Sequence, residues 1–429
     1  MKGLPLRLGC YAISPSLGHL PGLHSSSFDS FSSITPSLSL SLGSRSYDTF
    51  TFWKKMGHLS SMFNGLARSF SIKKAKNKNG KSYAKEAADE MAREAKKKDL
   101  ILRSSGCINA DGSNNLASVF SRRGEKGVNQ DCAIVWEGFG CQEDMIFCGI
   151  FDGHGPWGHF VSKQVRNSMP ISLLCNWKET LSQTALAEPE ADLDESDKKL
   201  QRFAIWKYAY LKTCEAVDRE LEHHRKIDSF NSGTTALTVV RQGEVIYIAN
   251  VGDSRAVLAT VSDEGSLVAV QLTVDFKPNL PQEEERIIGC NGRVFCLQDE
   301  PGVHRVWQPE EEYPGLAMSR AFGDYCIKEY GLVSVPEVTQ RHISIRDQFV
   351  ILATDGVWDV ISNQEAIDIV SSTADRPKAA KRLVQQAVKA WNRKRRGIAM
   401  DDISAVCLFF QSSESSSSLS QHVHPDSTL

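Results

Sequence analysis

Five short acidic turns border apolar, β-branched runs of this sequence. Asp152 and Asp355 directly follow two such runs, and Asp253 lies just after a third. Asp131 and Asp401 stand at the start of two more. A single aspartate in such a turn most often belongs to a hairpin. Five of them at strand ends instead predict that the carboxylates meet at one edge of a folded sheet.

Carboxylates that meet in this way would repel one another strongly unless cations lay between them. Carboxylate, carbonyl and water oxygens are hard ligands that suit Mg²⁺ or Mn²⁺, and no C-x-x-C pair or His/Cys cluster indicates zinc. Glycine at position 153 would leave its own carbonyl open to an ion. Two ions about 3.5 to 4 Å apart can activate a bridging water and align it with a phosphorus atom. The pattern therefore predicts hydrolytic phosphoryl chemistry.

Two basic side chains could complete such a site. His154 follows the Asp152-Gly153 turn and could protonate the leaving oxygen. Lys126, with two arginines close by in the sequence, could hold the phosphate oxygens. The alternatives are a surface histidine in a turn and a basic turn that only faces solvent.

The elements that must position these residues are short strands with a few helices. We expect strands at 132–136, 145–151, 235–240, 244–250, 256–260, 268–272, 348–354 and 403–410. We expect helices at 199–225, at 377–395 and from a capping box at 362–365 onward, with an acidic loop at 188–199. Strands that come in runs favour sheets packed on each other with helices outside, and not a doubly wound parallel sheet.

Composition limits the remaining function classes. The chain has 429 residues, of which 41% are hydrophobic and 24% charged, as in an ordinary soluble globular protein. A formal charge of -2 removes the whole-chain argument for nucleic-acid binding. The eleven cysteines are scattered and predict reduced thiols in a reducing compartment. No run reaches the 18 or so apolar residues of a membrane-spanning helix.

The sequence divides into four segments. Residues 1–55 form a Ser-rich, acid-poor leader that resembles a transit peptide, and residues 412–429 form a Ser-rich tail without a core. Residues 106–411 are predicted to be the catalytic domain. Residues 56–105 contain a basic linker and a helix expected at 83–102; Met56-Gly57 there would allow N-myristoylation if translation began at Met56.

The basic cluster after this Met-Gly pair contains Lys73, Lys74, Lys76, Lys78 and Lys81, and could supply the second signal that a single acyl chain needs. It predicts a cytoplasmic protein with peripheral attachment to the plasma membrane. The alternatives are a solvated linker beside a chance Met-Gly pair, and a plastid location if the leader is a transit peptide.

Seven motifs stand in the order found in the metal-dependent serine/threonine protein phosphatases of type 2C, and the sequence most resembles plant members. They are EKGVNQD (125–131), FDGHG (151–155), SGTTA (232–236), GDSRA (252–256), SRAFGD (319–324), TDGVWD (354–359) and DDIS (401–404). The resemblance implies an α+β fold in which helices flank a central antiparallel β-sandwich on both sides. It also implies two Mg²⁺ or Mn²⁺ ions with a metal-bound water as the nucleophile.

The family's site residues are carried over by motif. Asp152 would bridge both ions and Gly153 would bind one of them through its carbonyl. Asp355 and Asp401 would bind the other ion, and Asp131 would hold metal-bound waters. The neighbouring Asp402 leaves a choice of ligand, and Asp401 is preferred because the family's ligand is followed by Asp or Asn and then an apolar residue.

The other motif residues would support this centre. His154 would be the general acid, and Lys126 would hold the phosphate at a position where many animal members have Arg. Asp253 and Asp359 would help to bind a weaker third metal. The same outer group would include Thr235 and Gln130, and Gln130 stands where many animal members have Glu.

The resulting hypothesis is a monomeric Mg²⁺/Mn²⁺-dependent phosphatase that acts on phosphoserine and phosphothreonine of protein substrates, in signalling. Two rival functions use the same residues. The first is a catalytically silent module that binds phosphoproteins, and the intact set of acidic residues argues against it. The second is a structural Ca²⁺-binding sandwich, which assays with Mn²⁺ and with Ca²⁺ would distinguish.

Overall fold

The computed structural model describes residues 107–109, 112–113, 116–187 and 194–410. The predicted leader, the basic segment with its helix, the first half of the acidic loop and the Ser-rich tail lie outside the described residues. The described residues belong to one compact unit, Lys81–Leu429.

Two six-stranded antiparallel sheets form the centre of the fold. The first contains, in spatial order, β1 (Cys107–Asn109), β4 (Cys132–Glu137), β5 (Met145–Phe151), β8 (Ala236–Gln242), β9 (Val245–Val251) and β16 (Glu337–His342). The second contains β11 (Leu267–Gln271), β10 (Arg255–Val261), β17 (Asp347–Ala353), β18 (Ile403–Phe409), β3 (Ala117–Arg122) and β2 (Gly112–Ser113). The predicted antiparallel sandwich is confirmed.

The inner faces of both sheets share one apolar core. Alternate residues of each strand point inward, as the two-residue period of a strand requires. Val135 and Ile248 of the first sheet pack in the same cluster as Leu258 and Val350 of the second, and all four are buried. Because these strands are rich in β-branched residues, they both favour the extended backbone and fill this layer.

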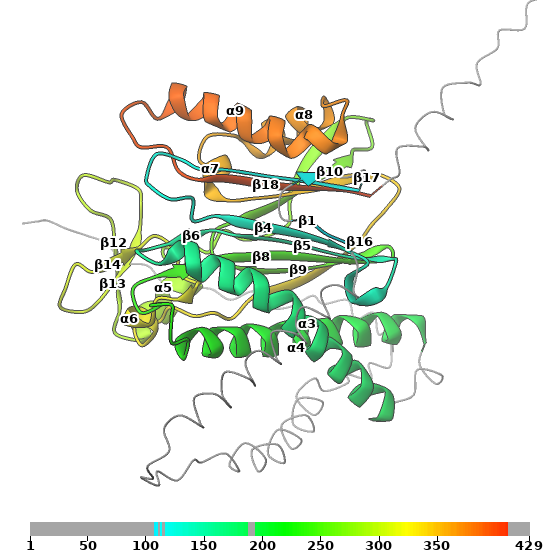
Figure 1. Ribbon diagram of the computed structural model, residues 1–429, viewed down its shortest axis with the longest axis horizontal. Coiled ribbons are helices and arrows are strands. Elements are labelled where there is room, and N and C mark those ends of the chain that lie inside the picture. The colour runs from blue at the N-terminus through cyan, green and yellow to red at the C-terminus, as the bar shows by residue number, and fades with distance from the viewer. Residues whose placement is uncertain (1–106, 110–111, 114–115, 188–193, 411–429) are drawn as a thin grey trace, which may run out of the picture. The chain divides into compact units, whose positions relative to one another are not determined.

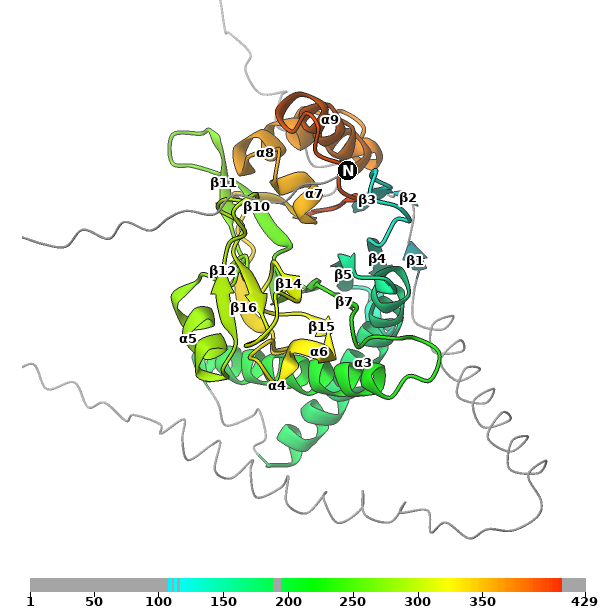
Figure 2. The same cartoon turned by 90° about the vertical axis from the view of Figure 1, so that its left-hand side faces the viewer.

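Helices cover the outer faces of both sheets (Figures 1 and 2). The first sheet is covered by α3 (Gly158–Ala187) and α4 (Glu195–Glu222), and the second by α7 (Asp355–Trp358), α8 (Asn363–Ser371) and α9 (Ala379–Lys394). Trp206 of α4 stacks on Tyr247 of the first sheet with ring centroids 5.2 Å apart. In the described part of the chain, no helix is both long enough and apolar enough to span a bilayer.

Two features of the structure differ from the expected elements. Residues 195–199, expected in a loop, form the first turn of α4, where Asp194 caps the helix by accepting from the Asp197 amide at 2.8 Å. This end suits an acidic sequence because the helix dipole is positive there. The long helix α3 was not predicted. It contains Pro170 and buries Val161, Leu173 and other apolar residues, so it gives no clear amphipathic signal.

Smaller elements lie at one end of the sandwich. β6 (Gly153–His154), β7 (Gly233–Thr234) and β15 (Phe322–Gly323) form one small sheet. β12 (Arg293–Phe295), β13 (Arg305–Trp307) and β14 (Pro314–Leu316) form another, near α5 (Pro281–Gly289) and α6 (Tyr325–Lys328) (Figure 1). Two 3₁₀ turns lie at Phe139–Cys141 and Arg376–Lys378. The nine cysteines at 132, 141, 148, 175, 214, 290, 296, 326 and 407 are free thiols.

Candidate metal centre and active site

Asp131 and Asp152 face each other across one edge of the first sheet. Asp131 directly precedes β4 and Asp152 directly follows β5, and these antiparallel strands pair Cys132 with Phe151. The strand register therefore brings the two carboxylates to the same place. Asp131 is buried and accepts a hydrogen bond from Thr354 Oγ1 through Oδ2 at 3.0 Å. Its other oxygen, Oδ1, has no hydrogen-bond partner among the described residues.

Asp355 and Asp401 are brought together in the same way by the second sheet. Asp355 begins α7 just after β17, and Asp401 lies two residues before β18, which pairs with β17. The Thr354 amide donates to Ser404 O at 3.2 Å. Because Thr354 also contacts Asp131, this threonine joins the acidic edges of the two sheets.

We call Asp131, Asp152, Asp355 and Asp401 the acidic group. Two further aspartates, Asp253 and Asp359, extend this group outward. Asp253 lies in the turn that carries the chain from β9 in the first sheet to β10 in the second, and it is buried. One of its oxygens pairs with Lys277, and the other has no hydrogen-bond partner among the described residues. Asp359 is exposed, and its Oδ2 lies 3.7 Å from Arg395 Nη2.

Three of these carboxylates, Asp131, Asp152 and Asp355, have raised pKa values. Burial raises the pKa of Asp131 to about 7, and Asp401 and Asp402 add to the effect. Burial also raises the pKa of Asp152 well above its usual value, with further contributions from Asp131, Asp355 and Asp401. The pKa of Asp355 rises for the same reasons. These carboxylates therefore lie within electrostatic range of one another without enough positive charge to balance them.

The main chain around Asp152 is held tightly. The Asp152 amide donates to Thr235 Oγ1 at 3.0 Å, and the Thr235 amide donates to Asp152 O at 2.9 Å. Thr235 thus supports the backbone of Asp152. At Gly153, a Cβ atom would lie 2.5 Å from Gly158 O and 2.6 Å from Gln130 O. Only glycine fits there.

The contacts of Lys126 show which of the neighbouring residues Asp401 and Asp402 faces the other carboxylates. Its ammonium donates to Asp401 Oδ2 at 2.5 Å. Burial would lower the pKa of Lys126, but Asp401, Asp355 and Asp152 raise it above its usual value. Asp402 instead accepts from the amides of Gly124 and Gln130, both at 2.7 Å. Asp401 therefore faces the acidic group, and Asp402 holds the adjoining loop.

Gln130 is also a structural residue in this geometry. Its side-chain amide donates to Gly155 O at 2.7 Å, and its main-chain carbonyl accepts from Ser162 Oγ at 2.6 Å. It fixes the turn that follows His154 against the start of α3. Its side chain is directed to that turn and not to the carboxylates.

His154 has a partner that the sequence analysis did not assign, Asp324. His154 Nε2 lies 2.6 Å from Asp324 Oδ2, and Asp324 is buried. Because a carboxylate only accepts, Nε2 carries the hydrogen of this bond. Nδ1 is buried and has no hydrogen-bond partner among the described residues. Burial would lower the pKa of His154, but Asp324 and Asp253 raise it.

The backbone around Asp324 fixes this carboxylate in place. Asp324 has φ 52° and ψ 48°, a left-handed conformation that Asp tolerates better than most residues. Its amide donates to Ser232 O at 3.0 Å, and the amide of Gly323 donates to Asp218 Oδ1 at 2.9 Å. A Cβ atom on Gly233 would lie 2.0 Å from Asp324 Oδ2 and 2.7 Å from His154 Nε2. The His154–Asp324 pair therefore has room only because residue 233 is glycine.

A buried ion-pair network anchors the chain just before Asp324. Glu283 of α5 accepts from Ser319 Oγ at 2.6 Å and pairs with Arg320 Nη2 at 2.7 Å and with Arg286 Nη1 at 2.8 Å. Burial would raise the pKa of Glu283, but these hydrogen bonds lower it to about 2. The network fixes the SRAFGD segment relative to α5.

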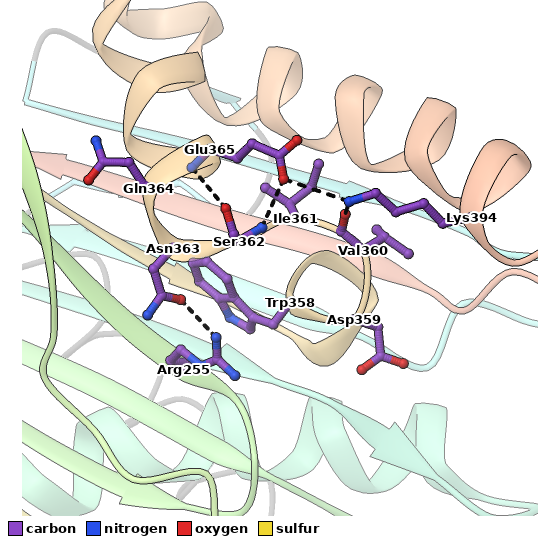
Figure 3. Close-up of a pocket in the computed structure, with 10 residues that line it drawn as sticks. All are labelled: Arg255, Trp358, Asp359, Val360, Ile361, Ser362, Asn363, Gln364, Glu365 and Lys394. Atoms are coloured by element: carbon purple, nitrogen blue, oxygen red, sulfur yellow. Dashed lines mark hydrogen bonds and ion pairs between the residues drawn. The ribbon is translucent and has the colours of Figure 1, made fainter. Parts of the chain in front are cut away.

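A groove of 520 Å³ opens beside the acidic group. Its lining includes Asp359, Arg255 and Trp358, together with the first residues of α8 (Figure 3). Arg255 pairs with Asp275 and donates to Asn363 Oδ1 at 2.7 Å, and its guanidinium lies over the Trp358 ring. The charges that line this groove are therefore largely paired within the protein.

The structure brings all the predicted site residues to one end of the sandwich. Gln130 and Thr235 serve there as supports. Two residues were missed: Asp324 ends the SRAFGD motif, and Lys277 stands two residues after Asp275. Among the described residues, no three His, Cys, Asp or Glu side chains are arranged to hold an ion by themselves. An ion here would therefore need water or main-chain oxygen to complete its shell.

Comparisons with known proteins agree on one family. Residues 126–395, more than half of the chain, match the family described as protein phosphatase 2C. The chain is 91% identical over 365 residues to a probable protein phosphatase 2C 34 of Arabidopsis thaliana, with 85% of this chain and 100% of the relative covered. It is 58% identical over 363 residues to a probable protein phosphatase 2C 48 of rice, Oryza sativa subsp. japonica, with 83% and 99% covered.

A solved structure supports the fold. A serine-threonine phosphatase 2C from Toxoplasma gondii superposes with a TM-score of 0.63 at 24% identity, covering 71% of this chain and 99% of that one. The chain therefore belongs to the protein phosphatase 2C family, in its plant type, and is a protein phosphatase.

Proposed function

We propose that this protein hydrolyses phosphoserine and phosphothreonine in protein substrates with the help of two Mg²⁺ or Mn²⁺ ions at the acidic group, and a weaker third ion beside Asp253 and Asp359. Members of the family are metal-dependent in general. One observation carries the proposal: carboxylates from both sheets converge, and the two buried ones, Asp131 and Asp253, each have an Oδ1 atom without a hydrogen-bond partner among the described residues.

The residues present fit divalent cations. Oxygen atoms are the preferred ligands of Mg²⁺, which keeps several waters and needs only one or two carboxylates. Asp152 with the Gly153 carbonyl would hold one ion, and Asp355 with Asp401 the other, while Asp131 would bind their waters. When bound, such ions lower the pKa of water and offset the phosphate charge. Binding would also relieve the repulsion that raises the pKa of Asp152.

Two side chains would act on the substrate directly. Lys126 would exchange part of its contact with Asp401 for a phosphate oxygen, because its position on an exposed turn leaves its ammonium accessible. His154 would donate a proton from Nδ1 to the leaving oxygen, since Nε2 is held by Asp324. Asp324 is then a positioning residue that orients the imidazole and stabilises its protonated form.

The test is a metal titration of the full chain with a phosphothreonine peptide. We expect no hydrolysis after thorough chelation, recovery with Mn²⁺ or Mg²⁺, and calorimetric binding of either ion to the protein alone. Recovery with Ca²⁺ but not with Mn²⁺ would contradict the proposal. Ca²⁺ binding without any phosphatase activity would favour the structural Ca²⁺-binding alternative.

We also propose a cytoplasmic location with reversible attachment to the plasma membrane, as a monomer. The support is the Met56-Gly57 pair and the lysine cluster that follows it, both outside the described residues. One acyl chain binds bilayers only marginally, and each nearby lysine adds about 1 kcal/mol on an anionic surface. Import into plastids through residues 1–55 is the competing proposal.

A further inference from the structure

Four consecutive basic residues, Arg393, Lys394, Arg395 and Arg396, end α9 and begin the loop that returns to the active site. We call them the basic run. All four are exposed, and Asp401 follows five residues after Arg396. Cations at the end of a helix are favourable there in any case, because the helix dipole is negative at its C-terminus. The contacts of each side chain therefore decide whether the basic run has a role beyond stabilising the end of α9.

The first two residues of the basic run are directed to the fold itself. Lys394 donates to Val360 O at 2.6 Å and lies 3.7 Å from Glu365 Oε2 (Figure 3). Arg393 lines a groove between α8 and α9, together with Glu365 and Asp368. Both residues thus lie beside carboxylates of α8, and Lys394 pairs with one of them.

Arg395 and Arg396 face a different space. They line a separate pocket of 220 Å³ whose other walls include Trp391, Ile398, Met400 and Glu125. Arg395 keeps a 3.7 Å contact with Asp359. Arg396 has no ion-pair partner among the described residues, and the one carboxylate in the lining, Glu125, already accepts from the Met400 amide at 3.2 Å.

This pocket adjoins the candidate metal centre through two adjacent chain segments. The Glu125 amide donates to Met400 O at 2.8 Å, which joins the two segments beside the pocket. The next residue of each segment, Lys126 and Asp401, forms the 2.5 Å pair at the acidic group. A peptide whose phosphate reaches Lys126 would therefore carry its neighbouring side chains past Arg396.

We propose that this pocket binds an anionic side chain of the substrate, so that the enzyme prefers phosphosites with an acidic neighbour. The occupant is a Glu, an Asp or a second phosphorylated residue on the same peptide. Arg396 supplies a planar guanidinium suited to either anion, and the apolar surface of Ile398, which is 56% exposed, would contact the peptide beside it. The inference rests on the proposed function, since it assigns a substrate class to that same site.

The test measures kcat/KM of the full chain, with Mn²⁺, on a set of phosphothreonine peptides. Each peptide carries one Glu, one Gln or one phosphoserine at a single position within three residues of the phosphothreonine. We expect the best Glu peptide to exceed its Gln counterpart by about fivefold at low salt, which corresponds to about 1 kcal/mol. The phosphoserine peptide should exceed the Glu peptide, and both preferences should shrink as salt rises.

Arg393 provides a matched control for Arg396. Arg396→Gln and Arg393→Gln remove the same charge from the same run, but only Arg396 lines the pocket. We expect Arg396→Gln to bring the Glu:Gln ratio near one and Arg393→Gln to keep it. Both variants should hydrolyse a small aryl phosphate at the wild-type rate, because neither residue belongs to the catalytic group.

Three results would overturn the inference. The first is an equal rate on Glu and Gln peptides. The second is an equal loss of preference in the two variants, which would indicate only a general electrostatic effect of the basic run and no specific contact with Arg396. The third is weaker binding of both variants to phosphatidylserine vesicles with no change in peptide preference, which would assign the run to a membrane. Metal-dependent hydrolysis of the Gln peptide in any of these cases would leave the proposed function intact.

Discussion

His154 Nε2 lies 2.6 Å from Oδ2 of Asp324, a residue 170 positions further along the chain. This pair occupies Nε2, so Nδ1 is the nitrogen that would donate a proton if His154 is the general acid that we propose. The relation depends on three elements that meet only in the folded protein: β6 with His154, β7 with Gly233, and the segment after β15 with Asp324.

Asp324→Asn should slow hydrolysis of phosphoserine peptides by roughly 10²-fold, the size expected when a catalytic group loses its alignment or charge partner. Asn tolerates the left-handed backbone at this position, so the fold should survive. The loss should be much smaller with an aryl phosphate, whose leaving group needs little protonation. Steady-state kinetics on both substrates measure the contrast.

His154→Ala serves as the reference for this prediction. It should show the same contrast between substrates, and the double variant should be no worse than His154→Ala alone, because Asp324 acts through His154. Additive losses in the double variant, or equal losses on both substrates, would mean that the two residues do not act together as acid and positioning group.

Gly233→Ala should disturb the same pair sterically. Its Cβ would lie 2.0 Å from Asp324 Oδ2, so the carboxylate must move, and such overpacking typically costs about 1 to 3 kcal/mol. We expect a lower melting temperature and reduced activity on phosphoserine peptides. Gly289→Ala, at the end of α5 with open space around it, is the control and should lower neither property, because alanine favours the helix more than glycine does. A fully active Gly233→Ala variant would contradict the geometry described for this pair.

Asp152→Asn and Asp355→Asn should each abolish metal-dependent hydrolysis of a phosphopeptide while the protein stays folded. Removing one carboxylate from a repulsive group relieves charge and need not destabilise the metal-free protein. Phosphopeptide assays with Mn²⁺, calorimetric Mn²⁺ binding and circular dichroism would measure the three properties. Turnover close to wild type in either variant would exclude a two-metal mechanism.

The metal-free protein should lose stability as pH rises. Asp131 has a folded-state pKa of about 7, above the value near 3.9 expected in the unfolded chain. A raised carboxyl pKa contributes stability that is fully present below about pH 4 and is lost as pH rises through about 7. The asparagine in Asp131→Asn cannot ionise, so the variant should not lose this stability. In EDTA, the melting temperature of the variant minus that of the wild type should therefore be larger at pH 8 than at pH 5.

The expected size of this pH effect is on the order of a few kcal/mol, since each pKa unit corresponds to about 1.4 kcal/mol. Added Mg²⁺ should stabilise the wild type at pH 8 more than it stabilises the variant. Parallel pH curves for the two proteins in EDTA would show that Asp131 ionises as freely in the folded state as in the unfolded one.

Much of the sandwich was predictable because its strands follow a local rule. Runs such as Met145–Phe151 are β-branched or aromatic and end in Gly or Asp turns, so their positions agree with the structure almost to the residue. The helix α3 was not predictable from a period, because Pro170 lies inside it and apolar residues occur around much of its circumference. The short strands β12 to β14 contain few residues and depend on contacts with one another.

The acidic residues were predictable for a related reason, because strand ends in an antiparallel sheet meet at known edges. The partner of His154 was not, since the contact with Asp324 depends on a left-handed backbone and on the approach of three short strands. Lys277 was missed because its pairing with Asp253 joins two turns that only tertiary structure brings together.

In a protein that begins at Met56, Gly57→Ala should shift the enzyme from the membrane fraction to the soluble fraction. Myristoylation requires the glycine, and the acyl chain and the lysine cluster are each too weak to hold the protein alone. Neutralising Lys73, Lys74 and Lys76 should also weaken attachment, in a salt-sensitive way, without changing phosphopeptide turnover. Fractionation with N-terminal mass spectrometry measures both effects. If Gly57→Ala leaves the distribution unchanged, the acyl anchor is wrong. If the mature full-length protein is found inside plastids, residues 1–55 act as the targeting signal instead.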